Sequence, residues 1–205
     1  MKYWHFVYIL IIGVLITTIS ILYRSRNNNE SQINLYVAQN IRMDNYYKFL
    51  KFKDKEMYLS NGTILSPELI LIDENDKSFK FSDLVTSNSN VPKIVIRLSA
   101  VACDICLDEE LKIIKGYISI IGTENIMIFA SSYNLRSLKV RKNNLLIDIP
   151  IYQIEETGIQ FEANHTNLFV FTINSDFTVK DFFIPEKSLP EISNDYYDVI
   201  SKKYW

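Results

Sequence analysis

The most continuous apolar stretch of the chain lies at its beginning. Residues 6–22, FVYILIIGVLITTISIL, carry no charge and lie between Lys2 and the pair Arg24 and Arg26. With aromatic neighbours at both ends the stretch extends over residues 3–23, roughly the 20 residues that a helix needs to cross a bilayer. No small-x-small cleavage site follows, as a secretory signal peptide would require. The pattern therefore predicts an uncleaved transmembrane signal-anchor, with its flanks, in residues 1–26.

A polar segment follows this apolar stretch. RSRNNNESQ contains three consecutive asparagines and no apolar period, which is typical of a tether. The next segment, residues 33–58, mixes apolar and polar positions so that a helix and a loose strand fit equally. We therefore expect a tether and juxtadomain segment at 27–59, ahead of a folded domain at 60–205.

Within that domain, several apolar runs have the length and period of strands. Residues 70–72 and the alternating Phe79 and Phe81 flank the turn DENDK, which predicts a hairpin. The runs KIVIRLSA, apolar except for Arg97, and NIMIFAS are typical of buried central strands. Further strands are predicted in LLIDIPIYQI and on both sides of the Asn-Ser-Asp turn in NLFVFTINSDFTVKDFFIP.

Other segments have helical spacing. From Cys103 to about Gly122, apolar residues recur every three or four positions: Leu107, Leu111, Ile114, Ile118 and Ile121. YNLRSLKVRKNN predicts a short helix. SLPEISNDYYDVISKKYW predicts a terminal helix in which Ser188 and Glu191 are spaced as a capping box, with the apolar face Ile192, Tyr196, Val199 and Ile200. The order of elements predicts a three-layer α/β fold, a central mixed sheet with flanking helices.

The charge balance and the absence of known binding motifs exclude several classes of function. The 22 basic and 24 acidic residues nearly cancel and form no basic stripe, so no nucleic-acid partner is expected. The sequence has no phosphate loop, dinucleotide fingerprint or paired His-Glu metal motif, so no cofactor is expected.

The only two cysteines, Cys103 and Cys106, lie three positions apart where a predicted strand passes into a helix. The positive end of the helix dipole and unpaired N–H groups favour a thiolate there. The second sulfur lies one turn inward, where it can resolve a mixed disulfide. The spacing therefore fits Cys103 as the attacking and Cys106 as the resolving cysteine. A structural or vestigial disulfide is an alternative; metal ligation is disfavoured, because His5 and His165 are the only histidines.

The order of strand, Cys-x-x-Cys, amphipathic helix, strand, strand pair and terminal helix resembles the thioredoxin-like superfamily. More narrowly, SPELILIDENDKSFKFSDLV and PKIVIRLSAVACDIC resemble its membrane-anchored TlpA-like and peroxiredoxin-like branch. The resemblance covers about residues 60–205. It implies a thioredoxin fold and thiol–disulfide exchange with extracytoplasmic thiol or disulfide proteins.

The chain departs from the family pattern around this motif. Ala102 stands where a tryptophan is common in the family. NHTNLFVFTIN has no proline where the family has a cis-proline, so Thr166, Asn167 or Leu168 would occupy that position. Asp104 adds a negative charge that opposes thiolate formation. His165 is either a proton relay or a solvated loop histidine. Arg97 is either a strand-end arginine paired with a carboxylate or a cation that stabilises the thiolate.

The sequence thus predicts a single-pass protein of a bacterial inner (cytoplasmic) membrane, in contact with the bilayer through residues 3–23. Its C-terminal domain is expected on the extracytoplasmic, periplasmic side, where disulfides persist. The predicted function is thiol-disulfide oxidoreduction. The alternative is a redox-inactive binding or interaction module at the membrane surface with a structural or vestigial cysteine pair.

Overall fold

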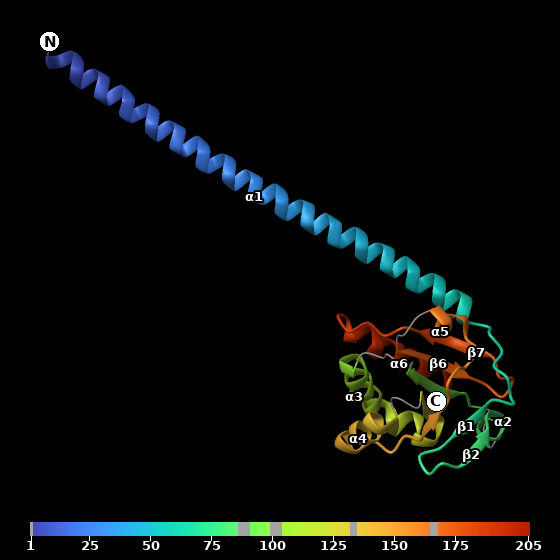
Figure 1. Ribbon diagram of the computed structural model, residues 1–205. Helices are drawn as coiled ribbons and strands as arrows, with labels where there is room; N and C mark the ends of the chain where they lie inside the picture. The colour runs from blue at the N-terminus through green and yellow to red at the C-terminus, as the bar shows by residue number, and fades with distance from the viewer. Residues whose placement is uncertain (1, 86–90, 99–103, 132–134, 165–167) are drawn as a thin grey trace. The chain divides into compact units, whose positions relative to one another are not determined.

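The computed structural model describes residues 2–85, 91–98, 104–131, 135–164 and 168–205. The chain divides into two compact units, Met1–Phe52 and Lys53–Trp205. Helix α1, Lys2–Ser60, makes up the first unit and supplies the beginning of the second (Figure 1).

Helix α1 includes both the predicted anchor and the predicted tether. The segment 33–58, for which a helix and a loose strand fitted equally, is helical, and so is the polar run before it. Over the described residues, the structure contains no helix that is both long and apolar enough to cross a membrane. Of the predicted anchor, the side chains of residues 4–11 lie outside the described part of the chain.

In the described part of the second unit, seven strands form one mixed sheet in the order β2-β1-β5-β4-β3-β6-β7. Strands β3, β4 and β5 run parallel, whereas β6 pairs antiparallel with β3, and β7 with β6. The hairpin β1-β2 joins the edge at β5. The strand bounds are β1 Ile70–Ile72, β2 Ser78–Lys80, β3 Lys93–Leu98, β4 Ile126–Ala130, β5 Ile151–Gln153, β6 Phe169–Ile173 and β7 Val179–Phe183.

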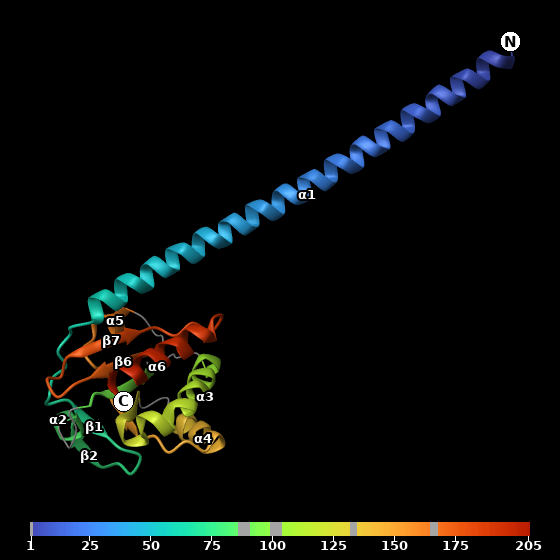
Figure 2. The same ribbon diagram turned by 180° about the vertical axis from the view of Figure 1, so that it is seen from behind.

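Three longer helices cover one face of this sheet: α3 Asp104–Ile121, α4 Leu135–Leu145 and α6 Pro190–Tyr204. Helix α3 lies beside both α4 and α6 (Figures 1 and 2). Alternate residues of a strand face the same way, and Ile94, Ile96 and Leu98 of β3 pack in one core cluster with the apolar face of α3. Burial of each such side chain stabilises the fold by about 1.5–3 kcal/mol.

The opposite face of the sheet is covered by aromatic side chains. Phe81, in the short helix α2 Phe81–Val85, packs edge to face on Phe129 of β4, with ring centroids 5.8 Å apart. Phe161, in the short helix α5 Gln160–Asn164, packs in the same way on Phe169 of β6 at 5.5 Å. The predicted arrangement of a mixed sheet with flanking helices is therefore confirmed.

The predicted hairpin and its turn are also present, but β2 ends at Lys80. Phe81, predicted as part of that strand, begins helix α2 and is buried. The backbone N–H of Phe81 still donates to the carbonyl of Leu69, which stands opposite it in the hairpin register, at 2.8 Å, while its ring packs in the core against Phe129.

The terminal helix differs from its prediction in two details. The capping box does not form: Leu189 is the N-cap residue, and the Ser188 hydroxyl donates to Glu186 Oε1 at 3.0 Å. The apolar face is also rotated. Val199, predicted to be buried, is exposed, whereas Tyr197 is buried, because the side of α6 that packs inward carries Ser193, Tyr197, Ile200 and Ser201. Those positions have the i, i+4, i+7, i+8 spacing of one helix face.

Candidate functional site

The cysteine motif lies at the junction between β3 and α3. Strand β3 ends at Leu98, and α3 begins at Asp104. Cys103, the residue directly before α3, lies outside the described residues, and the side chains of Asp104 and Cys106 are not described. Cys106 is the third residue of α3. The predicted passage from buried strand to helix start is confirmed by the backbone on both sides of the motif.

The sheet register brings the neighbouring chain segments to the same edge. Strand β6 pairs antiparallel with β3, so that Arg97 lies opposite Phe169. Leu98, the last described residue before Cys103, and Leu168, the first described residue after Thr166, therefore border the same end of these strands. His165 and Thr166 themselves lie outside the described residues, and their proposed roles stay predictions.

Arg97 is enclosed in the protein, with 1% of its surface exposed. Its Nε donates to Oε1 of Glu162 at 2.5 Å, and its Nη2 forms an ion pair with the same oxygen. The remaining contacts go to main-chain carbonyls: Nη1 donates to Ile154 at 3.0 Å and Nη2 to Glu155 at 2.6 Å. The predicted pairing of Arg97 with a carboxylate is therefore confirmed. Its second interpretation, as a cation that stabilises the thiolate, stays a prediction.

Glu162, the partner of Arg97, is itself held on both oxygens. Its Oε2 accepts hydrogen bonds from the backbone N–H of Thr157 at 2.7 Å and from the Thr157 hydroxyl at 2.5 Å. The pair lies on the aromatic side of the sheet, because Ile96 and Leu98, which flank Arg97, face α3. Two buried charges are tolerated there because each is hydrogen-bonded as well as paired. Sequence analysis missed Glu162, because α5 is too short to show a period.

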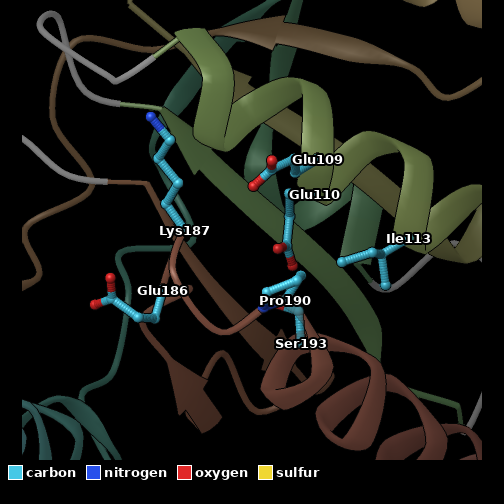
Figure 3. Close-up of a pocket in the computed structure, with 7 residues that line it drawn as sticks. All are labelled: Glu109, Glu110, Ile113, Glu186, Lys187, Pro190 and Ser193. Carbon is cyan, nitrogen blue, oxygen red and sulfur yellow. The ribbon is translucent and has the colours of Figure 1, made fainter.

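A second buried acid, also missed by sequence analysis, lies on α3. Glu110, one turn after Cys106, has 2% of its surface exposed and faces Ser193 and Tyr197 of α6. Figure 3 shows its carboxylate pointing from α3 to Pro190 and Ser193, at the beginning of α6. The spacing along the sequence could have indicated that Glu110 is buried. Leu107, Glu110 and Ile114 follow one another at three and four residues and so lie on the same inward face of α3.

Burial raises the pKa of the Glu110 carboxyl above its ordinary value. The hydroxyls of Tyr197 and Ser193 and the ammonium of Lys53 partly offset this rise. The contact with Tyr197 is loose: within the described part of the chain, Glu110 Oε1 and the Tyr197 hydroxyl make no hydrogen bond of normal length and angle. Burial also lowers the pKa of Lys53, against the opposing effect of nearby acids.

The described space next to Glu110 is small. The cavity holds about 10 Å³ and is lined by Glu109, Glu110, Ile113, Glu186, Lys187, Pro190 and Ser193 (Figure 3). That volume is the minimum for one water molecule. We therefore assign Glu110 to the junction between α3 and α6, next to the cysteine motif in sequence but without a ligand pocket.

A larger, open pocket of about 350 Å³ lies between the β1-β2 turn and the segment before β5. Lys142 closes one side of it: its Nζ lies 2.7 Å from Glu74 Oε1 and 3.1 Å from the carbonyl of Ile149. Although acidic side chains line this pocket, no group of three or more metal-ligating side chains occurs among the described residues. Its polar contacts serve to fasten the hairpin to α4.

No family model matches the sequence, and no curated protein matches it either. In structure, the chain is similar to the thioredoxin domain of a thiol-disulfide oxidoreductase from Bacteroides vulgatus, at a TM-score of 0.51 and 12% identity, covering 72% of this chain and 99% of that one. It is also similar to a thiol:disulfide interchange protein from Bacteroides sp., at a TM-score of 0.50 and 13% identity, covering 71% and 91%. At such identities the likeness shows the fold: the chain has a thioredoxin-like α/β fold.

Proposed function

We propose that this protein is a thiol-disulfide oxidoreductase in which Cys103 attacks and Cys106 resolves. One observation carries the proposal: in a thioredoxin-like fold, the two cysteines of the chain occupy the junction between the buried strand β3 and the start of helix α3. Two solved structures of the same fold are described as a thiol-disulfide oxidoreductase and a thiol:disulfide interchange protein, which supports the same reaction class here.

The proposed reaction begins with the Cys103 thiolate. It attacks one sulfur of a partner disulfide, the partner's S–S bond breaks, and one partner thiolate leaves. Cys106 then loses its proton, and its thiolate attacks Cys103 in the mixed disulfide and releases the second partner thiolate. The partner gains two electrons and two protons, and the Cys103–Cys106 pair becomes the disulfide. The reverse sequence oxidises a dithiol partner.

The chain supplies three supports for this chemistry. The unpaired N–H groups at the start of α3 favour a negative sulfur at Cys103 and in the first turn. The Arg97–Glu162 pair fixes the end of β3 from the opposite side of the sheet. The antiparallel pairing of β3 and β6 puts Leu98 and Leu168 at the same end of these strands, which supports roles for His165 and Thr166 near Cys103.

We further infer that residues 3–23 anchor the protein in a bacterial inner membrane, with the domain on the periplasmic side. The uncharged run from Phe6 to Leu22 and the aromatic residues at its ends support this placement. Partners would then be extracytoplasmic thiol or disulfide proteins. Proteolysis of intact spheroplasts tests the topology: the domain should be digested from outside, and its full protection would contradict the inference.

The redox potential of the cysteine pair tests the proposed activity. The full chain in detergent is equilibrated with glutathione or dithiothreitol buffers, and its thiols are counted by alkylation and mass shift. We expect a potential between about −120 and −270 mV, as in exchange proteins. Cys103→Ser should abolish the exchange, while Cys106→Ser should accumulate a mixed disulfide with the partner.

The rival function gives the opposite results. A redox-inactive binding module with a structural disulfide would show a potential below about −300 mV. It would also exchange no faster in the wild type than in Cys103→Ser. The departures at Ala102 and in the proline-free segment around Thr166 are the features that favour this rival.

A further inference from the structure

The first unit carries a stripe of residues spaced alternately by four and three positions along α1. Its second half consists of Ile33, Tyr36, Asn40, Met43, Tyr47 and Leu50. Residues spaced 3.5 positions apart on average stay on one side of two helices that coil around each other. Over residues 33–50 the stripe therefore forms one seam along α1, and other apolar residues such as Leu35 and Ile41 lie outside it.

The same register can be followed backwards into the first half of α1, with polar residues at two positions. Extended backwards in the same register, the stripe passes through Asn29 and Arg26 to Leu22, Ile19, Leu15 and Ile12. Of the six charged residues from Ile12 to Leu50, only Arg26 is on it. Charged residues thus lie mostly off the stripe, both in the apolar first half of α1 and in its more polar second half.

Residue types along the stripe select a particular association. In parallel two-stranded coiled coils, β-branched residues prefer the first apolar position of each heptad and leucine prefers the second. In the segment beyond the proposed anchor, Ile33 occupies a first position and Leu50 a second. Asn40 falls at a first position, where a single asparagine fixes the register of a parallel pair by meeting its equivalent.

In the first unit the stripe is exposed. Every side chain described between residues 12 and 48 is exposed, including Tyr36 at 63%, Met43 at 71% and Tyr47 at 67%. An isolated helix gains little stability from propensity alone, so a long helix with an uncovered apolar seam is expected to have a partner. A fully buried aromatic side chain contributes about 150–250 Å². Because Tyr36 is 63% and Tyr47 67% exposed, the four tyrosines of two chains can bury roughly 400–650 Å² more, about a third to a half of the roughly 1,200 Å² that a stable interface needs.

We propose that the protein is a parallel homodimer in which α1 of one chain coils around α1 of a second copy, with Asn40 against Asn40. A self-complementary stripe suits a two-fold symmetric interface, in which the same surface is used twice. A bilayer does not explain the stripe at residues 33–50, because charged residues there lie on the other sides of the helix. The dimer is independent of the cysteine chemistry.

Disulfide trapping tests the seam position by position. In the full chain with Cys103→Ser and Cys106→Ser, Met43→Cys places a thiol on the stripe, and Asn45→Cys places one on the opposite side. After mild oxidation in non-denaturing detergent, we expect most of the Met43→Cys protein as a disulfide-linked dimer and the Asn45→Cys protein as a monomer. Equal trapping at both positions, or none at Met43→Cys, would overturn the proposal.

Light scattering of the full chain gives a second, disulfide-independent reading. The wild type should have the mass of two chains. Tyr36→Glu with Met43→Glu puts two charges into the seam and should give one chain, whereas Ala38→Glu with Asn45→Glu adds the same charges off the seam and should leave two. A wild-type mass of one chain, or the same mass for both double variants, would contradict the dimer.

Discussion

Arg97 and Glu110 are two buried charged residues close to the cysteine pair in sequence, but they are accommodated in opposite ways. Arg97 lies six residues before Cys103 and is paired with Glu162, which two donors from Thr157 hold in turn. Glu110 lies four residues after Cys106, and its Oε1 has no hydrogen-bond partner within the described part of the chain. Burial raises its pKa. Arg97 thus belongs to a hydrogen-bonded ion pair. Glu110 is a buried carboxyl group that can change its protonation state.

The difference follows from the two faces of the sheet. On the aromatic face, the segment 154–157 turns its main-chain groups toward Arg97, and α5 adds a carboxylate. On the helical face, the α6 groups that lower the pKa of Glu110 are two side-chain hydroxyls, those of Tyr197 and Ser193. A strand beside an irregular segment can therefore satisfy a buried charge more fully than two packed helices can.

Breaking the Arg97–Glu162 pair should have the largest effect. Glu162→Ala leaves an uncompensated buried cation, so we expect the free energy of unfolding to fall by about 3–5 kcal/mol. Urea unfolding followed by circular dichroism measures it. The control is Glu156→Ala, at an exposed position in the same segment, which should change stability by less than about 0.5 kcal/mol.

Replacing both partners sharpens that result. Arg97→Met combined with Glu162→Met removes the charges together, and apolar replacements of buried pairs are often neutral or stabilising. We expect the double variant to recover most of the stability lost in Glu162→Ala. If the double variant were as unstable as the single one, Arg97 would contribute through its carbonyl hydrogen bonds and not through its charge.

Glu110 should make stability depend on pH with the sign of a raised pKa. The folded protein holds the Glu110 proton more tightly than the unfolded chain, so stability is highest below the ordinary carboxyl pKa of about 4.5 and falls as pH rises above it. Glu110→Gln removes this fall and should be more stable than the wild type at neutral pH by about 1–3 kcal/mol, the cost of an unsatisfied buried group.

The neighbouring Glu109 provides the matched control for this experiment. It is more exposed than Glu110 on the same turn of α3, so Glu109→Gln should leave the pH dependence of unfolding unchanged. Groups that face Glu110 from other elements, Lys53, Ser193 and Tyr197, stay in place in both variants. An identical pH profile in Glu110→Gln and the wild type would show that Glu110 is ionised at no cost.

Asp181 is a half-buried acid with three hydrogen-bond donors around its carboxylate. Burial alone would raise the pKa of Asp181, but hydrogen bonds from Lys203, Tyr204 and Thr172 outweigh it and lower the pKa below its ordinary value. Its stabilising effect is present above the ordinary pKa of 3.8 and is lost as pH falls through the lowered value. Asp181→Asn should cost about 1 kcal/mol at pH 7 and less at pH 3, the opposite slope to Glu110. A cost that does not depend on pH would indicate lost packing and not lost charge.

The sequence predicted those parts of the fold that local periodicity encodes. Helix α3, strands β3, β4, β6 and β7 and the β1-β2 hairpin appear where their apolar period or turn residues indicated. Arg97 was recognised as a charge inside an apolar run, but its partner Glu162 lies 65 residues away in a helix of five residues. No local pattern connects them, because the contact exists only after the sheet has formed.

Glu110 shows a different limit. Its position at the inward spacing of α3 was readable, but an acid between Glu109 and Leu111 looks like part of a solvated face until the rotation of α6 is known. That rotation was itself mispredicted, since Tyr197 and not Val199 faces inward. When the inward face of one helix is predicted wrongly, the burial of a charged residue on the helix packed against it is missed as well.

The smallest effect is expected from Asp104, the charged residue inside the cysteine motif. Its replacement tests whether the motif's own charge or the buried charges of Arg97 and Glu110 control the reactivity of the cysteines. Asp104→Asn removes a negative charge next to the thiols and should increase the rate of alkylation of Cys103 at pH 7 about two- to fivefold, the size of one solvated charge interaction at short range. The ratio of the variant's rate to the wild-type rate should fall toward one as salt is raised, because screening weakens the effect of the Asp104 charge in the wild type. Glu109→Gln, on the next turn of α3, is the control and should change the rate less. If Glu110→Gln changed the rate more than Asp104→Asn, the buried acid and not the motif's own charge would govern the reactivity of the cysteines.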